Sequence, residues 1–445
     1  MTEREFAIDV VRRLREAGFI AYFAGGCVRD EVLGLTPADF DIATNARPEQ
    51  VCPLFRRTIE VGAAFGVVEV LGPNQHKVQI ATFRSDGLYT DGRRPDSVVY
   101  STPEEDAQRR DFTINGMFFD PVENRLIDFV GGQEDLRRRV LRAIGNPVDR
   151  ITEDKLRMLR AARMATRFDL SMDPTTEAAI RAMAREVTVV SAERIAEEFR
   201  KMLEHPRRTA ALRLLDDLQL LIVILPEVDE MKGLPQGLPA APTGDLWDHV
   251  LKVMERLEGP TWPEPAPISF PLAFATLLHD VGKRRTAGRL AERYTFHGHE
   301  HVGRKMASDI ARRLKLSNEE RVRIEWLVDK HQYLCDAQVM RSSRLKRILV
   351  HPGIGELLAL HRADSLATGR PINHVEFCER ILRETPPEEL NPAPLVTGDD
   401  LTALGFPPGP RFKTILDSLR DAQLEGALVT REEAIDYVLR LNAEL

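Results

Sequence analysis

The chain has 445 residues, of which 43% are hydrophobic and 29% are charged, a composition that favours folded cores and excludes a disordered or fibrous chain. Its 62 basic and 69 acidic residues give a net charge of −7, which excludes a protein that coats nucleic acid with a strongly basic surface but allows a local basic groove. The longest aliphatic run, residues 220–225, is far shorter than the ~20 residues of a membrane span, and the four cysteines form no CxxC pair. We therefore expect a cytoplasmic protein with reduced thiols and no membrane partner.

The first 145 residues mix strand and helix signals. Short β-prone runs occupy 19–26, 67–71, 77–83 and 125–132, and a Gly-Pro-Asn turn between the second and third predicts a hairpin. Helical patterns that end in glycine lie on either side of the first run. This pattern predicts a head domain over residues 1–145 with a mixed sheet and helices.

From residue 146 onward helical patterns predominate. Thr152 can cap a helix that continues to Phe168, and Ser191 can cap another. Proline-rich connectors and turn signals divide this part into a neck at 146–232, a block at 246–384 and a tail at 394–445. We expect an α+β protein, with a mixed-sheet head followed by all-α neck, block and tail domains.

Three features of the head point to phosphate chemistry. Asp39 and Asp41 have strand spacing, which turns both carboxylates to one face where they can hold Mg²⁺ over a phosphate. The Gly25-Gly26 pair leads into a helix that carries Arg29, and a glycine turn lets the backbone approach phosphate oxygens. The segment RRDFTIN (109–115) adds two arginines and an acid. Each feature alone is also typical of a solvated turn or surface charge, and their conjunction carries the interpretation.

The predicted helix after Thr152 repeats charged residues every third position: Asp154, Arg157, Arg160 and Arg163. This spacing places neighbours on one helical face, where they form either a surface network of ion pairs or a base-reading set. An aspartate can accept from the exocyclic amine of cytosine or adenine, and an arginine can donate to the ring nitrogen beside it. Guanine and uracil present the opposite pattern, so such a pair would select C and A.

These segments resemble the successive motifs of the class II nucleotidyltransferases, the family of tRNA CCA-adding enzymes and bacterial poly(A) polymerases. The matching segments are GGCVRD (25–30), DFDIAT (39–44), RRDFTIN (109–115), DFVGGQEDL (128–136) and EDKLRMLRAAR (153–163). The resemblance implies that Asp39 and Asp41 are catalytic ligands of two Mg²⁺ ions. It implies nucleotide binding by Gly26, Arg29, Arg110, Asp111, Asp154, Arg157, Arg160 and Arg163.

One position departs from the family pattern. Many relatives have an acid in the strand before ATFR, where this chain has Gln79, and Glu69 on the preceding strand is only a weak substitute. The third carboxylate of the head therefore stays open. The segment 84–100 corresponds to the family's flexible loop and keeps Asp86, Asp91, Arg93 and Arg94, which favours an enzyme that completes the terminal A.

The block at 246–384 holds dispersed histidines and aspartates. Adjacent His279 and Asp280 after an apolar helix resemble the motif of HD phosphohydrolases. The resemblance implies a site for one or two divalent metals formed by His249, His279, Asp280, His299, His331 and Asp364. Imidazole and carboxylate together suit Mn, Fe, Ni or Zn better than Mg. Such domains hydrolyse phosphate esters or serve as RNA-holding scaffolds.

The sequence as a whole predicts stepwise, template-independent addition of C, C and A to the tRNA 3′ end from CTP and ATP. The alternatives are an A-adding enzyme, a poly(A) polymerase, a phosphohydrolase whose head only binds nucleotide, and a non-catalytic RNA-binding protein. Two basic clusters can follow the tRNA backbone or form solvated helix faces: Arg137, Arg138, Arg139 and Arg142, and Arg341, Arg344, Lys346 and Arg347. The sequence leaves the oligomeric state open.

Overall fold

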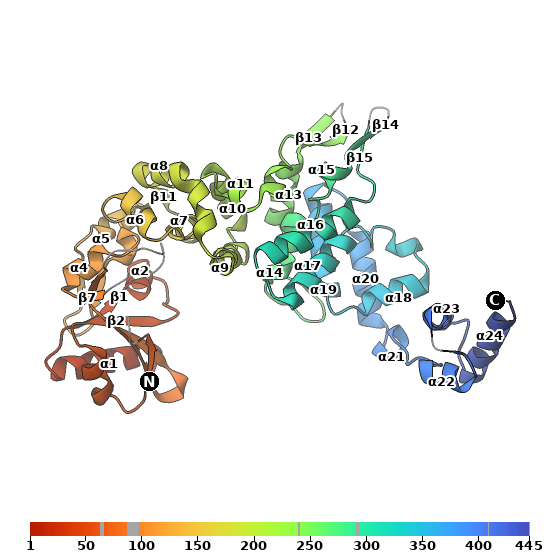
Figure 1. Cartoon of the computed structure of the whole chain (residues 1–445), viewed down its shortest axis with the longest axis horizontal. Helices are drawn as coiled ribbons and strands as arrows, with labels where there is room; N and C mark the ends of the chain where they lie inside the picture. Colours follow the sequence, from red (N-terminus) through yellow and green to blue (C-terminus); the bar gives the residue numbers. More distant parts are fainter. Residues whose placement is uncertain (63–65, 87–97, 239–240, 291–292, 408, 445) are drawn as a thin grey trace. The chain divides into compact units, whose positions relative to one another are not determined.

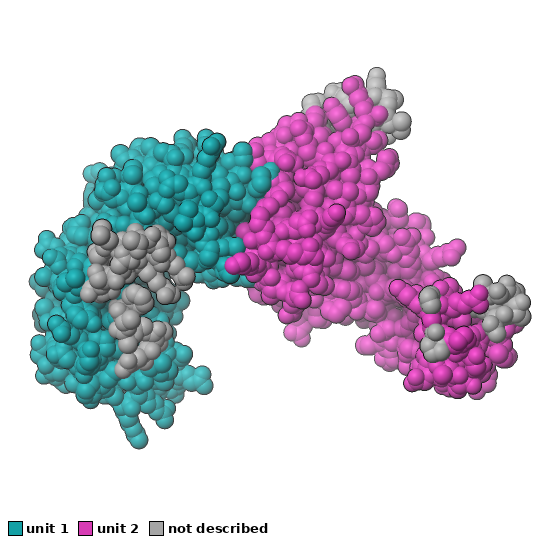
Figure 2. Space-filling view, viewed as in Figure 1, with its two compact units in different colours: residues 1–226 teal, residues 227–445 magenta. Residues whose placement is uncertain are grey.

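The computed structural model describes residues 1–445 except 63–65, 87–97, 239–240, 291–292, 408 and 445. The described chain forms two compact units, Met1–Pro226 and Glu227–Leu445 (Figure 2). The finer division into head, neck, block and tail stays a prediction. Most of the predicted flexible loop, including Asp91, Arg93 and Arg94, lies outside the described residues.

The head contains a mixed sheet, of which β1 and β2 are labelled in Figure 1. Its seven strands have the order β3-β4-β5-β2-β1-β8-β9. Its central strands β2 and β5 are parallel, and the other neighbouring strands are antiparallel. The strands are β1 (Ala21–Ala24), β2 (Phe40–Thr44), β3 (Thr58–Gly62), β4 (Val67–Leu71), β5 (Lys77–Thr82), β8 (Phe118–Asp120) and β9 (Arg125–Ile127). The predicted mixed sheet and the hairpin between β4 and β5 are confirmed.

Alternation along the strands decides which side chains face the core. On β5, Val78 and Ile80 are buried while Gln79 between them is exposed. Helix α1 (Glu3–Glu16) buries an apolar stripe and begins with a capping box between Thr2 and Glu5. Around the sheet lie α2 (Gly26–Val32), α3 (Pro48–Val51), α4 (Pro103–Gln108), α5 (Gly132–Arg137) and the paired strands β6 (Arg84–Asp86) and β7 (Val98–Tyr100).

Helices complete the first unit. They are α6 (Pro147–Glu153), α7 (Arg157–Arg167), α8 (Pro174–Met183), α9 (Ala192–Leu203), α10 (Arg208–Asp217) and α11 (Leu220–Ile224). A short parallel pair, β10 (Val140–Leu141) and β11 (Ser171–Met172), also lies in this unit. The expectation of one helix from Thr152 to Phe168 is wrong, because the chain turns out of helix between α6 and α7. Asp154 has extended backbone there, and its carboxylate accepts the Leu156 N–H at 3.0 Å, which competes with helical bonding.

The second unit is mainly helical. Its larger helices are α13 (Leu246–Arg256), α14 (Phe270–Leu278), α16 (His299–Arg313), α17 (Asn318–Lys330), α18 (Ser342–Leu349), α19 (Ile354–Ala367), α20 (Asn373–Glu384), α23 (Pro410–Leu424) and α24 (Arg431–Glu444). Two short antiparallel pairs add to it: β12 (Pro235–Leu238) with β13 (Ala241–Asp245), and β14 (Gly288–Leu290) with β15 (Arg293–Thr295). Among the described residues, no helix combines the length and apolarity that crossing a membrane requires.

Candidate active site and candidate metal centre

A cavity of about 490 Å³ in the first unit collects residues from the sheet, α2, the segment after α4 and α7. Its lining includes every residue of this unit predicted to bind metal or nucleotide except Arg163. Arg109, Asn115 and Met164 also line it. The motifs, which are separate in the sequence, therefore line one concave surface in the fold.

Two carboxylates stand at this cavity. Asp39 directly precedes β2, Asp41 is the second residue of that strand, and both line the cavity. Burial raises the pKa of Asp41 to about 6, and repulsion from Asp39 adds to the increase. A hard divalent cation such as Mg²⁺ would relieve the repulsion between these two carboxylates, because their oxygens are the ligands that it prefers.

The strand register places a row of three side chains on one face of the sheet. Asp41 lies opposite Gln79 on β5, and Gln79 lies opposite Glu69 on β4. An amide therefore stands beside Asp41, and the next carboxylate is one strand farther away. Glu69 also pairs with Lys77 at 3.3 Å.

The glycine turn brings backbone close to an arginine. Gly25 has a φ of +72°, and a Cβ atom on it would lie 2.9 Å from Nη1 of Arg110. A side chain at this position would therefore obstruct Arg110. Arg29 is buried, donates to Asp30 at 2.7 and 2.8 Å and to Asn115 Oδ1 at 2.7 Å, and lies over the Phe168 ring. These contacts hold the guanidinium group of Arg29 in place at the wall of the cavity.

Asp106 on α4 organises the adjacent arginines, and sequence reasoning did not find it. This buried carboxylate accepts from Arg109 at 2.7 and 2.9 Å and from Arg110 at 2.9 and 3.2 Å. It also accepts the Arg84 backbone N–H at 3.3 Å, at the base of the β6–β7 pair. Burial would raise the pKa of Asp106, but the two guanidinium groups lower it overall. The available signal was an acid three and four positions before two arginines, at the end of a helical segment.

Asp111 connects the head to α7. Its Oδ2 accepts from Arg160 at 2.6 and 2.9 Å, and its Oδ1 accepts from Asn115 Nδ2 at 3.0 Å and from the Phe112 N–H at 2.8 Å. Burial would raise the pKa of Asp111, yet the charge of Arg160 and the hydrogen bonds from Asn115 and Arg160 hold it well below its usual range. Asp111 is therefore an ionised acceptor that orients Arg160 at the cavity.

The predicted base-reading set is divided by the break between α6 and α7. Asp154 lies in the break and pairs with Arg194 of α9 at 2.8 Å. Arg157 at the start of α7 donates to the carbonyls of Arg150 and Arg109 at 2.7 and 3.2 Å and pairs with Glu153. Arg163 instead forms a buried ion pair with Glu198 of α9 at 2.5 Å. The expectation that all four share one helical face is therefore wrong, while Asp154, Arg157 and Arg160 do meet at the cavity.

The basic clusters are partly paired. Arg137 and Arg138 are mostly exposed and share Glu134, while Arg142 pairs with Asp135 and Asp173. In the second cluster Arg347 pairs with Asp421 at 2.8 Å and Arg344 donates to the Tyr333 hydroxyl at 2.7 Å. RNA contact by either cluster stays a prediction.

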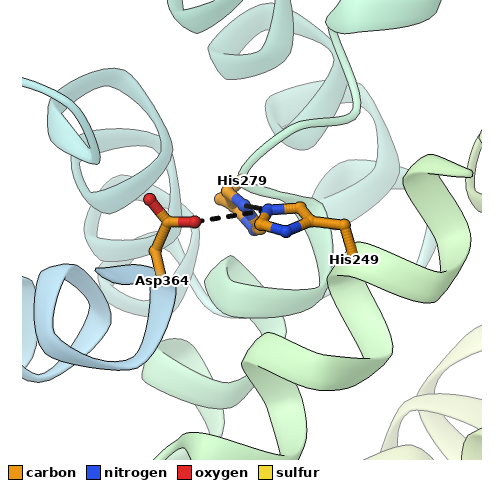
Figure 3. Close-up of side chains that lie close together, drawn as sticks. All are labelled: His249, His279 and Asp364. Carbon is orange, nitrogen blue, oxygen red and sulfur yellow. Dashed lines mark hydrogen bonds and ion pairs between the residues drawn. The ribbon is translucent and has the colours of Figure 1, made fainter. Parts of the chain in front are cut away.

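In the second unit, all six residues of the predicted metal set converge. They form two groups, His249 with His279 and Asp364, and Asp280 with His299 and His331. His249, His279 and Asp364 come from α13, the end of α14 and α19 and point toward one another (Figure 3). His249 Nε2 lies 3.3 Å from Asp364 Oδ1 and 3.4 Å from His279 Nε2.

Asp280 joins the two groups. Its Oδ2 lies 3.2 Å from His279 Nε2 and 3.4 Å from His249 Nε2, while its Oδ1 lies 3.3 and 3.4 Å from Nε2 of His299 and His331. Burial would raise the pKa of Asp280, but Lys283 at 2.7 Å and the imidazoles hold it well below its usual range. One carboxylate thus presents an oxygen to each group.

Backbone carbonyls orient three of the imidazoles. Nδ1 of His279, His299 and His331 lies 2.7, 2.8 and 2.7 Å from the carbonyl oxygens of Thr276, Phe296 and Val328 respectively. A carbonyl only accepts, so each Nδ1 carries the proton and each Nε2 presents its lone pair to the centre. This is the arrangement that metal-binding histidines require.

Family models match segments of both units. The poly A polymerase head domain family matches residues 21–142, a family described as probable RNA and SrmB-binding site of polymerase A matches 169–232, and the HD domain family matches 247–369. The chain is 33% identical to an A-adding tRNA nucleotidyltransferase of Deinococcus radiodurans over 95% of this chain and 96% of that protein.

Other relatives match part or all of the chain. It is 42% identical to a CCA-adding enzyme of Bacillus subtilis over 47% of this chain, and the match spans 52% of that relative. A crystal structure of the Bacillus stearothermophilus CCA-adding enzyme in complex with CTP aligns with a TM-score of 0.72 at 27% identity, covering 100% of this chain and 98% of that one. The resemblance read from the sequence is confirmed, and the chain belongs to the family of tRNA nucleotidyltransferases with a poly(A)-polymerase-type head and an HD domain.

Proposed function

We propose that the chain adds C, C and A to the 3′ end of tRNA from CTP and ATP without a nucleic-acid template. One observation carries this proposal: the acid pair Asp39 and Asp41 shares a cavity with Asp154 and Arg157, which can read the base. The relatives named for CCA addition support it, although those alignments span about half of their length.

The carboxylates and arginines of the cavity have separate tasks. Asp39 and Asp41 would hold Mg²⁺, which when bound activates the 3′-hydroxyl and neutralises the leaving pyrophosphate. Arg29, Arg110 and Arg160 orient the triphosphate so that the 3′-oxygen faces the α-phosphorus in line. The new phosphodiester bond forms as the bond between the α-phosphorus and the bridging oxygen breaks, the hydroxyl proton passes to solvent, and pyrophosphate leaves.

Base selection follows from donors and acceptors. Asp154 accepts from the exocyclic amine of cytosine or adenine. Among the described residues, three of the five N–H donors of Arg157 bond protein acceptors, which leaves two for a base. Uracil and guanine turn a carbonyl oxygen toward Asp154 and are rejected by repulsion between acceptors.

Product length tests this proposal. We would supply tRNA transcripts that end before CCA, after C and after CC with each single nucleotide and Mg²⁺, and resolve the products on a gel. The proposal predicts C addition to the first two substrates and A addition to the third. Addition of CC without A, or long runs of A, would contradict it.

A-adding activity is the second candidate for the head. The observation that favours it is the relative named for A addition, whose alignment covers nearly all of both chains. In the same assay this candidate predicts A addition to the CC-ended tRNA and no C addition to either shorter substrate.

For the second unit we infer a centre for two divalent metals that hydrolyses phosphate esters. Its support is the pair of ligand groups that share Asp280, together with the oriented Nε2 atoms of three histidines. This donor set favours Mn, Fe, Ni or Zn over Mg. Elemental analysis of the purified chain would show about two such ions, and hydrolysis of a nucleoside 2′,3′-cyclic phosphate would depend on them. A purified chain that contains no such metal, and that binds none when Mn, Fe, Ni or Zn is added, would contradict the inference.

A further inference from the structure

The metal centre of the second unit is most accessible at His249 and Asp364. Their side chains are 12% and 15% exposed, whereas those of the other four predicted ligands are between 1% and 5% exposed. Asp364 Oδ1 lies 3.3 Å from His249 Nε2, and the other oxygen of this carboxylate points away from the labelled histidines (Figure 3). A molecule from solvent would therefore reach the centre beside Asp364.

Arg370 stands at this accessible side. Its Nη2 donates to Asp364 Oδ2 at 2.9 Å, and its Nε donates to the Thr368 hydroxyl at 2.8 Å. The side chain is nevertheless 54% exposed. Within the described part of the chain, these two bonds use two of its five N–H donors. Three donors, two on Nη1 and one on Nη2, are therefore left for a ligand.

The way in which α19 ends places Arg370 at the centre. Gly369 has a φ of +68°, and its N–H donates to the Leu366 carbonyl at 3.2 Å, while the Arg370 N–H donates to the Ser365 carbonyl at 2.8 Å. These two bonds form a Schellman motif, which turns the chain back along the last turn of the helix. Arg370 therefore contacts Asp364 on that helix, and its backbone is held in place without help from the ion pair.

The two carboxylate ligands have different cations beside them. Lys283 lies 2.7 Å from Asp280, and its side chain is only 12% exposed. Arg370 lies 2.9 Å from Asp364 and is mostly exposed. A guanidinium group also presents parallel N–H donors that match two phosphate oxygens, whereas an ammonium group acts as a point charge. Of these two cations, Arg370 is the one suited to receive a phosphate that arrives from solvent.

We propose that Arg370 binds the phosphate group of the substrate at the metal centre, with the free N–H donors of Nη1 and Nη2 directed to non-bridging phosphate oxygens. This inference rests on the proposed hydrolysis of phosphate esters by the second unit. Asp364 then has two tasks, since it offers Oδ1 to a metal and uses Oδ2 to hold Arg370 at the open side.

The test compares wild type, Arg370→Gln and Arg370→Lys in the full chain at saturating Mn²⁺. We would measure kcat and KM for a nucleoside 2′,3′-cyclic phosphate, the Kd for inorganic phosphate by calorimetry, and the metal content by elemental analysis. Arg370→Gln should raise KM and the phosphate Kd about tenfold, the scale of one charge-assisted hydrogen bond, and should keep the metal content of wild type. Arg370→Lys keeps the charge without the fork and should give intermediate constants.

Arg383→Gln is the matched control. Arg383 is an exposed arginine of α20 that pairs with Glu379 at 3.5 Å. It carries the same charge on the same unit and contacts none of the predicted metal ligands within the described residues. Its replacement should change neither KM nor the phosphate Kd, so that a general loss of positive charge is separated from the loss of Arg370.

Wild-type values of KM and of the phosphate Kd in Arg370→Gln would overturn the inference. A lowered metal content with an unchanged phosphate Kd would also overturn it, because that result marks a residue that only orients Asp364. If the wild-type chain binds Mn²⁺ but hydrolyses no cyclic phosphate, the proposed hydrolysis fails, and the phosphate titration of Arg370→Gln decides the inference alone. A wild-type chain that binds no metal would overturn both.

Discussion

The two sites of this chain differ in what they offer a metal. The cavity of the first unit presents Asp39 and Asp41 at an open surface among arginines, and its lining residues suit a nucleotide triphosphate. The centre of the second unit buries Asp280 among histidines whose Nε2 atoms are already aimed inward. Mg²⁺ is commonly bound by one or two carboxylates together with substrate phosphates, whereas a full set of oriented imidazoles retains a metal by itself. We therefore expect a metal that arrives with substrate in the first unit and a resident metal in the second.

The largest expected effect on the metal content of the second unit concerns Asp280, because both ligand groups use it. Asp280→Asn should lower the affinity for a transition metal at least about tenfold, because loss of a residue that only orients a ligand already costs that much. Asp364→Asn, which removes a ligand from one group only, should leave about one ion per chain. Elemental analysis after desalting measures both contents. Retention of about two ions in Asp280→Asn would contradict a shared carboxylate.

Metal removal should separate the two activities. After treatment with a strong chelator and dialysis, hydrolysis of the cyclic phosphate should be lost, while addition of Mg²⁺ alone should restore nucleotide incorporation fully. Both rates are measured on the same preparation, with Zn²⁺, Mn²⁺ or Ni²⁺ added back as the positive control for hydrolysis. If nucleotide incorporation returns only with a transition metal, the proposal that Mg²⁺ serves the first unit is contradicted.

Replacement of Asp106 should affect the stability and nucleotide incorporation of the first unit and leave the metal centre of the second unchanged. Asp106→Asn leaves Arg109 and Arg110 without their buried counter-charge, which should lower the free energy of unfolding by about 3 kcal/mol. Incorporation should fall about tenfold as the two arginines lose their orientation. Urea unfolding and kcat/KM measure these effects, and Glu104→Gln at an exposed position of α4 is the control. Nucleotide incorporation at the wild-type rate in Asp106→Asn would contradict the role of Asp106 in orienting Arg109 and Arg110.

The smallest effect is expected at the exposed arginines of the first unit. Arg137→Ala with Arg138→Ala should weaken tRNA binding about threefold at low salt. The slope of the logarithm of the binding constant against the logarithm of the salt concentration should decrease by the equivalent of roughly one to two phosphate contacts. Stability should hardly change, because the shared ion pairs with Glu134 are exposed. Arg312→Ala, an exposed arginine of the second unit, is the control in the same titration. An unchanged salt slope would identify the first cluster as a solvated helix face.

Local sequence signals were sufficient for much of this architecture. The β-prone runs around glycines predicted β1, β4, β5 and β9, and dispersed histidines predicted a metal set that the fold brings together. What they missed depends on partners distant in sequence. Periodicity placed Asp154 within a helix, but its carboxylate bonds the Leu156 N–H and Arg194, forty residues later, and the helix stops at Glu153.

Arg163 illustrates the same limit. Spacing alone grouped it with Asp154, Arg157 and Arg160, yet Glu198 on α9 holds it in a buried pair away from the cavity lining. Asp106 carried a weak local signal, and its importance depends on the approach of Arg84 and on the turn of Arg109 and Arg110 in the folded head. Charge patterns identify candidates, and tertiary packing decides which of them face a substrate.

The central claim is that nucleotide transfer depends on the acid pair of the first unit and not on the metal centre of the second. Single-turnover incorporation of CTP into tRNA lacking CCA tests it directly, with wild type, Asp39→Ala combined with Asp41→Ala, and Asp280→Asn measured side by side. The account predicts a loss of at least about a thousandfold in the first variant, with cyclic-phosphate hydrolysis retained, and near wild-type incorporation in Asp280→Asn. Incorporation within tenfold of wild type in the Asp39 and Asp41 variant would contradict it.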